Sequence, residues 1–356
     1  MAQHSIKQLE TIRLIPGLVL GQDLKSPHGA ILLPSNTVLT DYIISKIKAW
    51  CFNHVNIMTL DCPSEVKVEN IEEETAEDVS FLEMYTQTVE NIGIIFEKMQ
   101  VGKKIPLREC SQIVEKILEQ TADIRGVVTR LRNVKSGNKY TYNHSLNVGI
   151  YAVLLGIWLK YDESVLRQLA MAGLLHDIGK ARISAKIIDK PGALTVDEFS
   201  RVKRHAAFGY KMIENTIGPS RQVRIAVAQH HEREDGSGYP LGLGIPNIHP
   251  YAKIISIADV YDSVTSDRAY RLGSSPYKAA DLILDEAFSR LDPAVASIFV
   301  HHMTTLFFYD KVRLNTGMIG TIVHMDPITP TRPLLQTERG YIDLRKKPAL
   351  QIVEIL

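Results

Sequence analysis

The stretch Gly173-Leu174-Leu175-His176-Asp177-Ile178-Gly179-Lys180 places an imidazole and a carboxylate on adjacent residues at the end of an apolar helix. A carboxylate has two oxygens, so such a pair can contact two metal ions at once. Gly179 suits the left-handed residue that ends a helix, and Lys180 puts a cation beside the pair. A His-Asp dipeptide alone more often caps a helix or forms a hydrogen bond, so the metal interpretation depends on the rest of the chain.

The composition is that of a folded protein without a strong electrostatic bias. The chain has 356 residues, of which 45% are hydrophobic and 23% charged, and its 41 Lys and Arg nearly balance its 40 Asp and Glu. A formal net charge of +1 gives no whole-protein field that attracts DNA, RNA or an anionic membrane. We therefore expect no nucleic-acid partner.

Three features predict a cytoplasmic protein without membrane insertion. Cys51, Cys62 and Cys110 form no pattern typical of a disulfide framework or a cysteine metal site. The polar start Met1–Ser5 lacks the basic and apolar regions of a signal peptide. The longest strongly apolar run, Val148–Leu159, is too short to span a bilayer.

The first part of the chain reads as three segments. Residues 1–62 combine short strands from Ile12 onwards with a helix over Asp41–Trp50, which predicts a small α+β module. Residues 63–78 form an acidic linker. Residues 79–135 predict a helical connector with amphipathic helices over Phe81–Met99 and Leu107–Leu131.

The connector and the two remaining segments define the fold class. We expect the connector helices to pack on the next domain, with a dimerising pair as the alternative. Residues 1–135 are therefore where we expect a homodimer contact or a signalling partner. Residues 136–309 read as nearly all helix, and residues 310–356 as a small antiparallel β element with a turn at Asn315–Gly317. The predicted fold class is mainly α.

Further candidate metal ligands lie on or at the ends of predicted helices: His144, His205, His230, His231 and Asp259. The helix that carries His205 starts at Thr195-Val196-Asp197-Glu198, a capping-box pattern. Asp259 lies in an apolar helix where a lone carboxylate needs a partner. Taken singly, each side chain is better explained as a hydrogen-bonded core residue.

Taken together, these residues form a nitrogen- and oxygen-rich set of five histidines and two carboxylates. Such a set suits borderline divalent metals, most of all iron or manganese. Seven ligands are too many for one ion, so they divide between two ions, with Asp177 as the bridge.

At this point the sequence resembles the HD superfamily of phosphohydrolases and, within it, the HD-GYP group. The resemblance rests on motifs in the family's order: His176-Asp177-Ile178-Gly179-Lys180, Lys190–Thr195, His205, His230-His231-Glu232-Arg233-Glu234-Asp235-Gly236-Ser237-Gly238-Tyr239-Pro240 and Asp259–Arg271. It covers about Tyr140 to Asp310. It implies an all-helical HD catalytic bundle that hydrolyses cyclic di-GMP to linear pGpG, and in some members on to GMP, by attack of a metal-bridging hydroxide.

The resemblance also implies roles for single residues. One metal would be held by His144, His176, Asp177 and Asp259, and the other by Asp177, His205, His230 and His231. Lys180 would act in catalysis and contact the substrate phosphate. Tyr239, Arg268 and Arg271 stand at the family's positions for substrate contacts, although both arginines could instead form surface ion pairs. Asp262 could orient a histidine from one helical turn after Asp259.

One departure and two alternatives remain at this stage. Some family members carry a glutamate for a third metal where this chain has Tyr140, so we expect two metals and leave the step to GMP open. The alternatives are a phosphohydrolase for another cyclic dinucleotide and a non-catalytic receptor. No general acid can be identified from the sequence.

Overall fold

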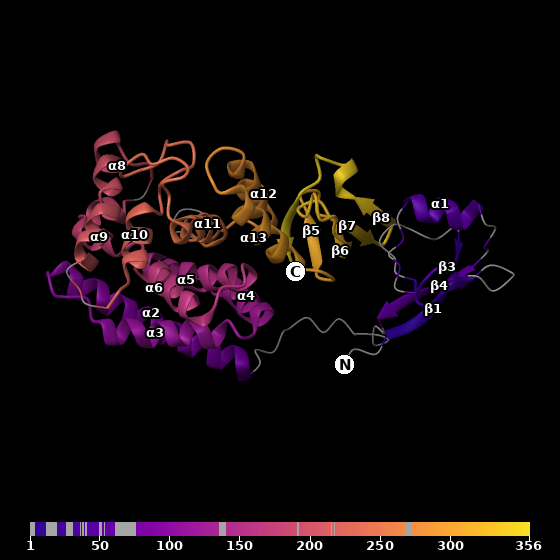
Figure 1. Ribbon diagram of the computed structural model, residues 1–356, viewed down its shortest axis with the longest axis horizontal. Coiled ribbons are helices and arrows are strands. Elements are labelled where there is room, and N and C mark those ends of the chain that lie inside the picture. Colours follow the sequence, from indigo (N-terminus) through magenta and orange to yellow (C-terminus); the bar gives the residue numbers. More distant parts are fainter. Residues whose placement is uncertain are drawn as a thin grey trace. The chain divides into compact units, whose positions relative to one another are not determined.

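The chain divides into two compact units, Met1–Glu73 and Glu74–Leu356. The computed structural model (Figure 1) describes residues 4–11, 20–25, 31–35, 37, 39, 41–49, 52, 54–60, 76–134, 140–190, 192–214, 216, 218–267 and 272–356.

The first unit is the predicted α+β module. Strand β1 (His4–Glu10) pairs antiparallel with β4 (His54–Leu60), and β2 (Leu24–Lys25) pairs with β3 (Ile31–Leu33). Helix α1 (Asp41–Ala49) contributes Ile44 and Ile47 to a small core. Strand β1 starts earlier than the expected strands from Ile12. Trp50, Cys51, Cys62 and the residues between Ile12 and Val19 lie outside the described residues.

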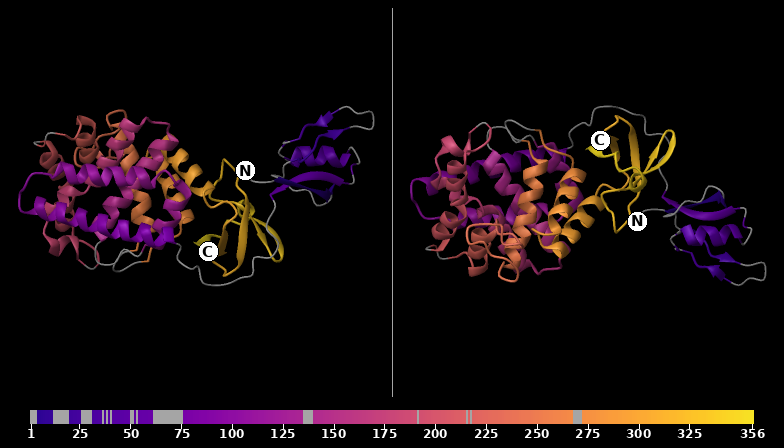
Figure 2. Two further views of the ribbon diagram at one scale, coloured as in Figure 1. Left: turned by 90° about the horizontal axis from the view of Figure 1, so that it is seen from below. Right: turned by 90° about the horizontal axis from the view of Figure 1, so that it is seen from above.

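The second unit is mostly helical, which confirms the fold class. Its helices are α2 (Ala76–Gln100), α3 (Leu107–Gln120), α4 (Ile124–Asn133), α5 (Tyr140–Trp158), α6 (Glu163–Leu175), η3 (Ile178–Arg182), α7 (Ala185–Ile188), α8 (Val196–Lys203), α9 (His205–Glu214), α10 (Arg221–Gln229), α11 (Pro250–Thr265), α12 (Pro276–Ala287) and α13 (Pro293–Thr305). Figure 1 shows α5 and α6 between α2–α3 on one side and α10–α12 on the other. The two views of Figure 2 show these opposite faces, with α2–α3 in purple and α11–α13 in orange.

Helix α5 is the centre of this arrangement because it is apolar around most of its circumference. Every residue from Asn143 to Gly156 is buried. A helix that is hydrophobic on all faces must be enclosed by other helices. This places His144, near the start of α5, inside the unit rather than on its surface.

The connector helices pack into the same core. Phe81, Tyr85, Val89 and Ile92 of α2 belong to the hydrophobic cluster of the helical unit. The single helix expected over Leu107–Leu131 was wrong in its extent, because Asp123 accepts a hydrogen bond from the Gly126 N–H and starts α4 as a new helix.

The chain ends in the expected antiparallel sheet. Its strands are β5 (Lys311–Leu314), β6 (Ile319–His324), β7 (Leu334–Thr337), β8 (Gly340–Asp343) and β9 (Ile352–Ile355), in the spatial order β8-β7-β6-β5-β9, with a short helix η4 (Leu344–Lys346). Strand β7 was missed by the sequence pattern. Gly317 has φ +83° in the tight turn between β5 and β6, a conformation that favours glycine. Among the described residues, no helix combines the length and hydropathy needed to cross a bilayer.

Candidate metal centre

Helix α6 delivers the His-Asp pair to the interior of the helical unit. It begins at Asp162, whose carboxylate caps the Val165 N–H, and ends at Leu175 with His176 as the C-cap. His176 and Asp177 are each only 1% exposed. The chain then continues as η3 rather than turning away.

The expected left-handed conformation of Gly179 was wrong, since this residue is not among those with positive φ. The glycine is required by space instead. A Cβ atom there would lie 1.9 Å from the carbonyl oxygen of His205 and 2.5 Å from the nitrogen of Gly209. Gly179 therefore lets the backbone of η3 touch α9, which brings His205 to the His-Asp pair.

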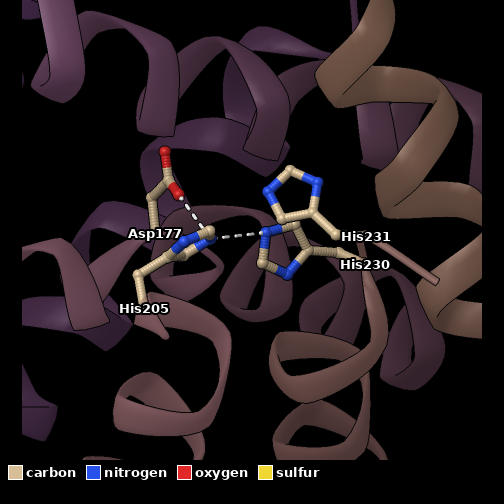
Figure 3. Close-up of side chains that lie close together, drawn as sticks. All are labelled: Asp177, His205, His230 and His231. Carbon is tan, nitrogen blue, oxygen red and sulfur yellow. Dashed lines mark hydrogen bonds and ion pairs between the residues drawn. The ribbon is translucent and has the colours of Figure 1, made fainter. Parts of the chain in front are cut away.

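The seven candidate ligands lie in two groups. The first consists of His144, His176 and Asp259, from α5, the end of α6, and α11. The second consists of Asp177, His205, His230 and His231 (Figure 3). Within each group, one potential ligand atom of every residue lies within 4.8 Å of the others.

Asp177 lies between the two groups and faces both. Its Oδ2 is 3.4 Å from His176 Nε2 and 3.8 Å from His144 Nε2. Its Oδ1 is 3.3 Å from His205 Nε2. One carboxylate thus presents a different oxygen to each group, which is the geometry of a bridging ligand.

Backbone carbonyls set the orientation of three imidazoles. The Nδ1 atom of His176 lies 2.7 Å from the carbonyl oxygen of Gly173. The same atom of His205 lies 2.7 Å from the oxygen of Val202, and that of His230 lies 2.8 Å from the oxygen of Val227. A carbonyl can only accept, so each Nδ1 carries the proton and donates. In each neutral ring, the lone pair is then on Nε2, the nitrogen that faces the other candidate ligands.

This arrangement fits divalent cations. His205 Nε2 and His230 Nε2 are only 3.2 Å apart, so two lone pairs face each other unless a cation lies between them. Burial lowers the pKa of His205 to about 4 and holds the pKa of His230 well below its usual range, which keeps both rings neutral. His176 Nε2 and Asp177 Oδ1 are buried and have no hydrogen-bond partner among the described residues. Buried polar atoms of this kind require a partner.

His144 is held by carboxylates rather than by a carbonyl. Its Nδ1 is 2.6 Å from Asp262 Oδ2, and its Nε2 is 3.1 Å from Asp259 Oδ1. Burial lowers the pKa of His144, but the hydrogen bonds to Asp259 and Asp262 outweigh it and raise the pKa to about 9. Asp262 therefore orients this histidine, as expected from its place one turn after Asp259.

Lys180 lies beside the bridging carboxylate. Its Nζ donates to Asp177 Oδ2 at 2.5 Å, and its side chain is 22% exposed. Burial raises the pKa of Asp177, but nearby positive charge, above all that of Lys180, outweighs it and holds the pKa well below the usual range. The carboxylate is therefore ionised, with an ammonium next to it.

The Gly-Tyr-Pro loop, which contains Gly238, Tyr239 and Pro240, packs against the second group of candidate ligands. The Tyr239 ring packs against the ring of His231 with centroids 4.6 Å apart. Burial raises the pKa of the Tyr239 hydroxyl, and the nearby charges of Asp259 and Asp177 add to the shift. Asp235 accepts from the N–H and the hydroxyl of Ser237, so it is a turn residue rather than a ligand.

Two residues near this loop were missed by sequence reasoning. The Glu232 carboxylate, 3% exposed, accepts from the Leu241 N–H at 2.7 Å and from the Leu243 N–H at 2.8 Å. The sequence signal that could have indicated Glu232 is its position directly after His230 and His231. Lys203 places its Nζ over the rings of Phe199 and Tyr239, at 4.8 and 5.4 Å from their centroids. The i,i+4 spacing of Phe199 and Lys203 on α8 was the available signal for the first contact, whereas the contact with Tyr239 joins distant segments.

Three further positions were singled out in the sequence: Arg268, Arg271 and Tyr140. Arg268 and Arg271 lie outside the described residues, so their predicted substrate contacts stay predictions. Tyr140, the position where the resemblance implies a third metal ligand in some family members, stacks its ring on His144 with centroids 5.5 Å apart and an interplanar angle of 12°.

Comparison with known proteins agrees with the geometry. Residues 132–295 match a family model described as HD domain. The match covers a little under half of the chain and includes all seven candidate ligands. The resemblance to the HD-GYP group that the motifs indicated is thereby supported, and it is strengthened by the relatives described next.

A protein named cyclic di-GMP phosphodiesterase from Pseudomonas aeruginosa is 34% identical over 231 residues, which are 64% of this chain and 55% of that protein. A protein named 3'3'-cGAMP-specific phosphodiesterase 3 from Vibrio cholerae is 33% identical over 160 residues, which are 45% of this chain and 35% of that protein. The chain thus spans about half or less of the length of these curated relatives.

A solved structure of an HDG"Y"P protein from Bdellovibrio bacteriovorus has the same fold. The two structures superpose with a TM-score of 0.51 over 83% of this chain and 98% of that protein, at 13% sequence identity. At this identity the match concerns the fold alone.

Proposed function

We propose that the helical unit is a metal-dependent phosphodiesterase that hydrolyses cyclic di-GMP to linear pGpG. The observation that carries the proposal is Asp177, whose two oxygens face two separate groups of buried imidazoles and carboxylates. The relatives named as cyclic dinucleotide phosphodiesterases support the substrate class.

We assign two divalent ions, iron or manganese, to the two groups. His144, His176, Asp177 and Asp259 would hold one ion, and Asp177, His205, His230 and His231 the other. Two such ions lower the pKa of a water molecule and neutralise charge on the phosphate under attack. The nitrogen- and oxygen-rich ligands favour borderline metals over those that prefer thiolates.

The protein's own residues bind and orient the substrate. Lys180, beside the bridging carboxylate, would hold a phosphate oxygen through its ammonium and stabilise the charge that develops there. Tyr239, packed on His231, would form one wall of the substrate pocket. Arg268 and Arg271 would contact phosphate or guanine, where a planar guanidinium binds bidentately or stacks.

The second candidate is hydrolysis of a mixed cyclic dinucleotide, because one relative is named as specific for 3'3'-cGAMP. Both substrates present the same phosphodiester to the metal centre and differ in one base. We further propose a cytoplasmic location, in line with the cysteine pattern. The homodimer or signalling partner expected through residues 1–135 stays a prediction.

The test is turnover by the full chain, loaded anaerobically with Fe²⁺ or Mn²⁺, on cyclic di-GMP and 3'3'-cGAMP in parallel. Chromatography separates linear dinucleotide from mononucleotides. We expect pGpG to accumulate, with little GMP. Faster turnover of 3'3'-cGAMP would favour the second candidate. Tight nucleotide binding without hydrolysis, at two metals per chain, would contradict the enzyme and indicate a receptor.

A further inference from the structure

A line of buried polar groups runs from the candidate metal centre to α2. Asp262 accepts from His144 Nδ1 through Oδ2 at 2.6 Å, and from Asn147 Nδ2 through Oδ1 at 2.8 Å. The Asn147 Oδ1 in turn accepts from the hydroxyl of Tyr85 at 2.8 Å. The four side chains are 1% to 5% exposed, so water does not substitute for these contacts.

The chemistry of the groups fixes the direction of each hydrogen bond. The Asp262 carboxylate can only accept, so the Asn147 amide must point its NH₂ towards it. The Asn147 oxygen then faces α2 and needs a donor, which the Tyr85 hydroxyl supplies. Without this donor, the buried Asn147 oxygen has lost its hydrogen bond and the amide is held only through Asp262, whose Oδ1 also accepts from Ser266 Oγ at 2.8 Å.

The position of Tyr85 is unusual for a residue connected to a metal ligand. It lies in α2, outside residues 132–295 that match the HD-domain model. Its hydroxyl is 3 hydrogen bonds away from His144, through Asn147 and Asp262.

We propose that Tyr85 is a positioning residue that sets the orientation of His144 through Asn147 and Asp262. The inference rests on the proposed metal centre. Helix α2 then contributes to the affinity of one metal site, the one that includes His144, and does not only cover the core. A rigidly held imidazole binds a metal more tightly because less orientational freedom is lost on binding.

The rival explanation is that Tyr85 only fills space in the core, where its ring packs against Phe81. Tyr277 offers a matched control. It is also 2% exposed, but its hydroxyl lies near the Met325 sulfur at 3.8 Å and takes no part in the line of groups. Replacing either tyrosine with phenylalanine removes one buried hydroxyl and keeps the ring.

The experiment is a Mn²⁺ titration of the full chain, followed by electron paramagnetic resonance, for the wild type, Tyr85→Phe, Tyr277→Phe, Asn147→Leu and the Tyr85→Phe/Asn147→Leu double variant. Partners of metal ligands typically change affinity about 10- to 100-fold. For the more distant Tyr85 we expect about 10-fold weaker binding at one of two sites, and wild-type binding for Tyr277→Phe. The double variant should bind no more weakly than Asn147→Leu, because both changes break the same line.

The outcomes separate this inference from the proposed function. Two Mn²⁺ sites in the wild type, with equal affinities in Tyr85→Phe and Tyr277→Phe, would overturn the role of Tyr85 and leave the metal centre intact. Additive losses in the double variant would also overturn it. A wild type that binds no Mn²⁺ would overturn the metal centre and this inference with it. Thermal unfolding of each variant checks that all are folded.

Discussion

Replacing Glu232 with glutamine should release the Gly-Tyr-Pro loop while leaving the metal ligands in place. The carboxylate accepts two backbone N–H groups, those of Leu241 and Leu243, one on each oxygen. A glutamine side chain has nearly the same shape but only one acceptor oxygen. Its NH₂ group would therefore face an N–H donor, and one of the two contacts would be lost.

The size of the effect follows from the burial of this contact. A hydrogen bond to a charged group contributes about 1.5–3 kcal/mol, and a buried N–H left without an acceptor costs about 1–3 kcal/mol. Because the loop can relax towards solvent, we take about 2 kcal/mol as the net loss. That corresponds to about a 30-fold smaller preference for the ordered loop.

Two measurements check this prediction. Amide exchange at Leu241 and Leu243 should be slow in the wild type and clearly faster in Glu232→Gln. The KM for cyclic di-GMP should rise, since Tyr239 lies in the same loop, while the chain still binds two Mn²⁺ ions. Asp235→Asn is the control in the same loop, because asparagine can keep the turn made with Ser237.

Two results would refute the reasoning. Fast exchange of both amides in the wild type would show that the carboxylate does not hold the loop. Unchanged exchange in Glu232→Gln would show that the loop is held by other contacts. A loss of bound metal in this variant would instead mean that Glu232 supports His230 and His231 directly.

Three further predictions address the site and its support. Asp177→Asn should lower the metal content from two ions per chain and abolish turnover, as measured by elemental analysis and product chromatography, because an amide cannot bridge two cations; full activity would contradict the bridge. Gly179→Ala should destabilise the unit by about 1–3 kcal/mol or more in denaturant unfolding, because its Cβ would overlap the backbone of His205; an unchanged unfolding midpoint would contradict the close approach. Asp292 should increase the free energy of unfolding at pH values above its ordinary pKa. This contribution should be lost as the pH falls through the lowered pKa that Asp292 has in the folded protein. Burial raises this pKa, but the hydrogen bond from Lys253 and the N–H groups of α13 outweigh it. Asp292→Asn, which can still cap α13, should therefore weaken the acid dependence of the urea midpoint below about pH 5; an identical pH profile would contradict this role.

The candidate ligands could be named from the sequence because each lies in a short local motif. His176 and Asp177 are adjacent, His230 and His231 are adjacent, and Asp259 stands out as a carboxylate in an apolar helix. Their assembly depends on the burial of α5 and on the close contact of η3 with α9. The apolar run of α5 predicts the first, whereas the second was indicated only by Gly179, which sequence reasoning interpreted as a left-handed helix end.

The features that sequence reasoning missed depend on contacts between distant segments. Tyr85 and Asn147 are 62 residues apart, and each alone reads as an ordinary helix residue. The break between α3 and α4 was missed because the apolar spacing continues across it while Asp123 caps a new helix. Hydrophobic periodicity reports which face is buried, but it does not report which polar groups meet inside.

Tyr140 connects the question of metal number to the same first metal group. The resemblance to the HD-GYP group implies a glutamate here in some members, which would add a negatively charged ligand, whereas in this chain an aromatic ring lies nearly parallel to His144. The ring covers one face of the imidazole, while Asp262 holds its Nδ1 from the edge. A tyrosine ring offers no carboxylate to a third ion at this position, so the packing agrees with the proposal of two ions, with His144 held by Tyr140 on its face and by Asp262 at its Nδ1.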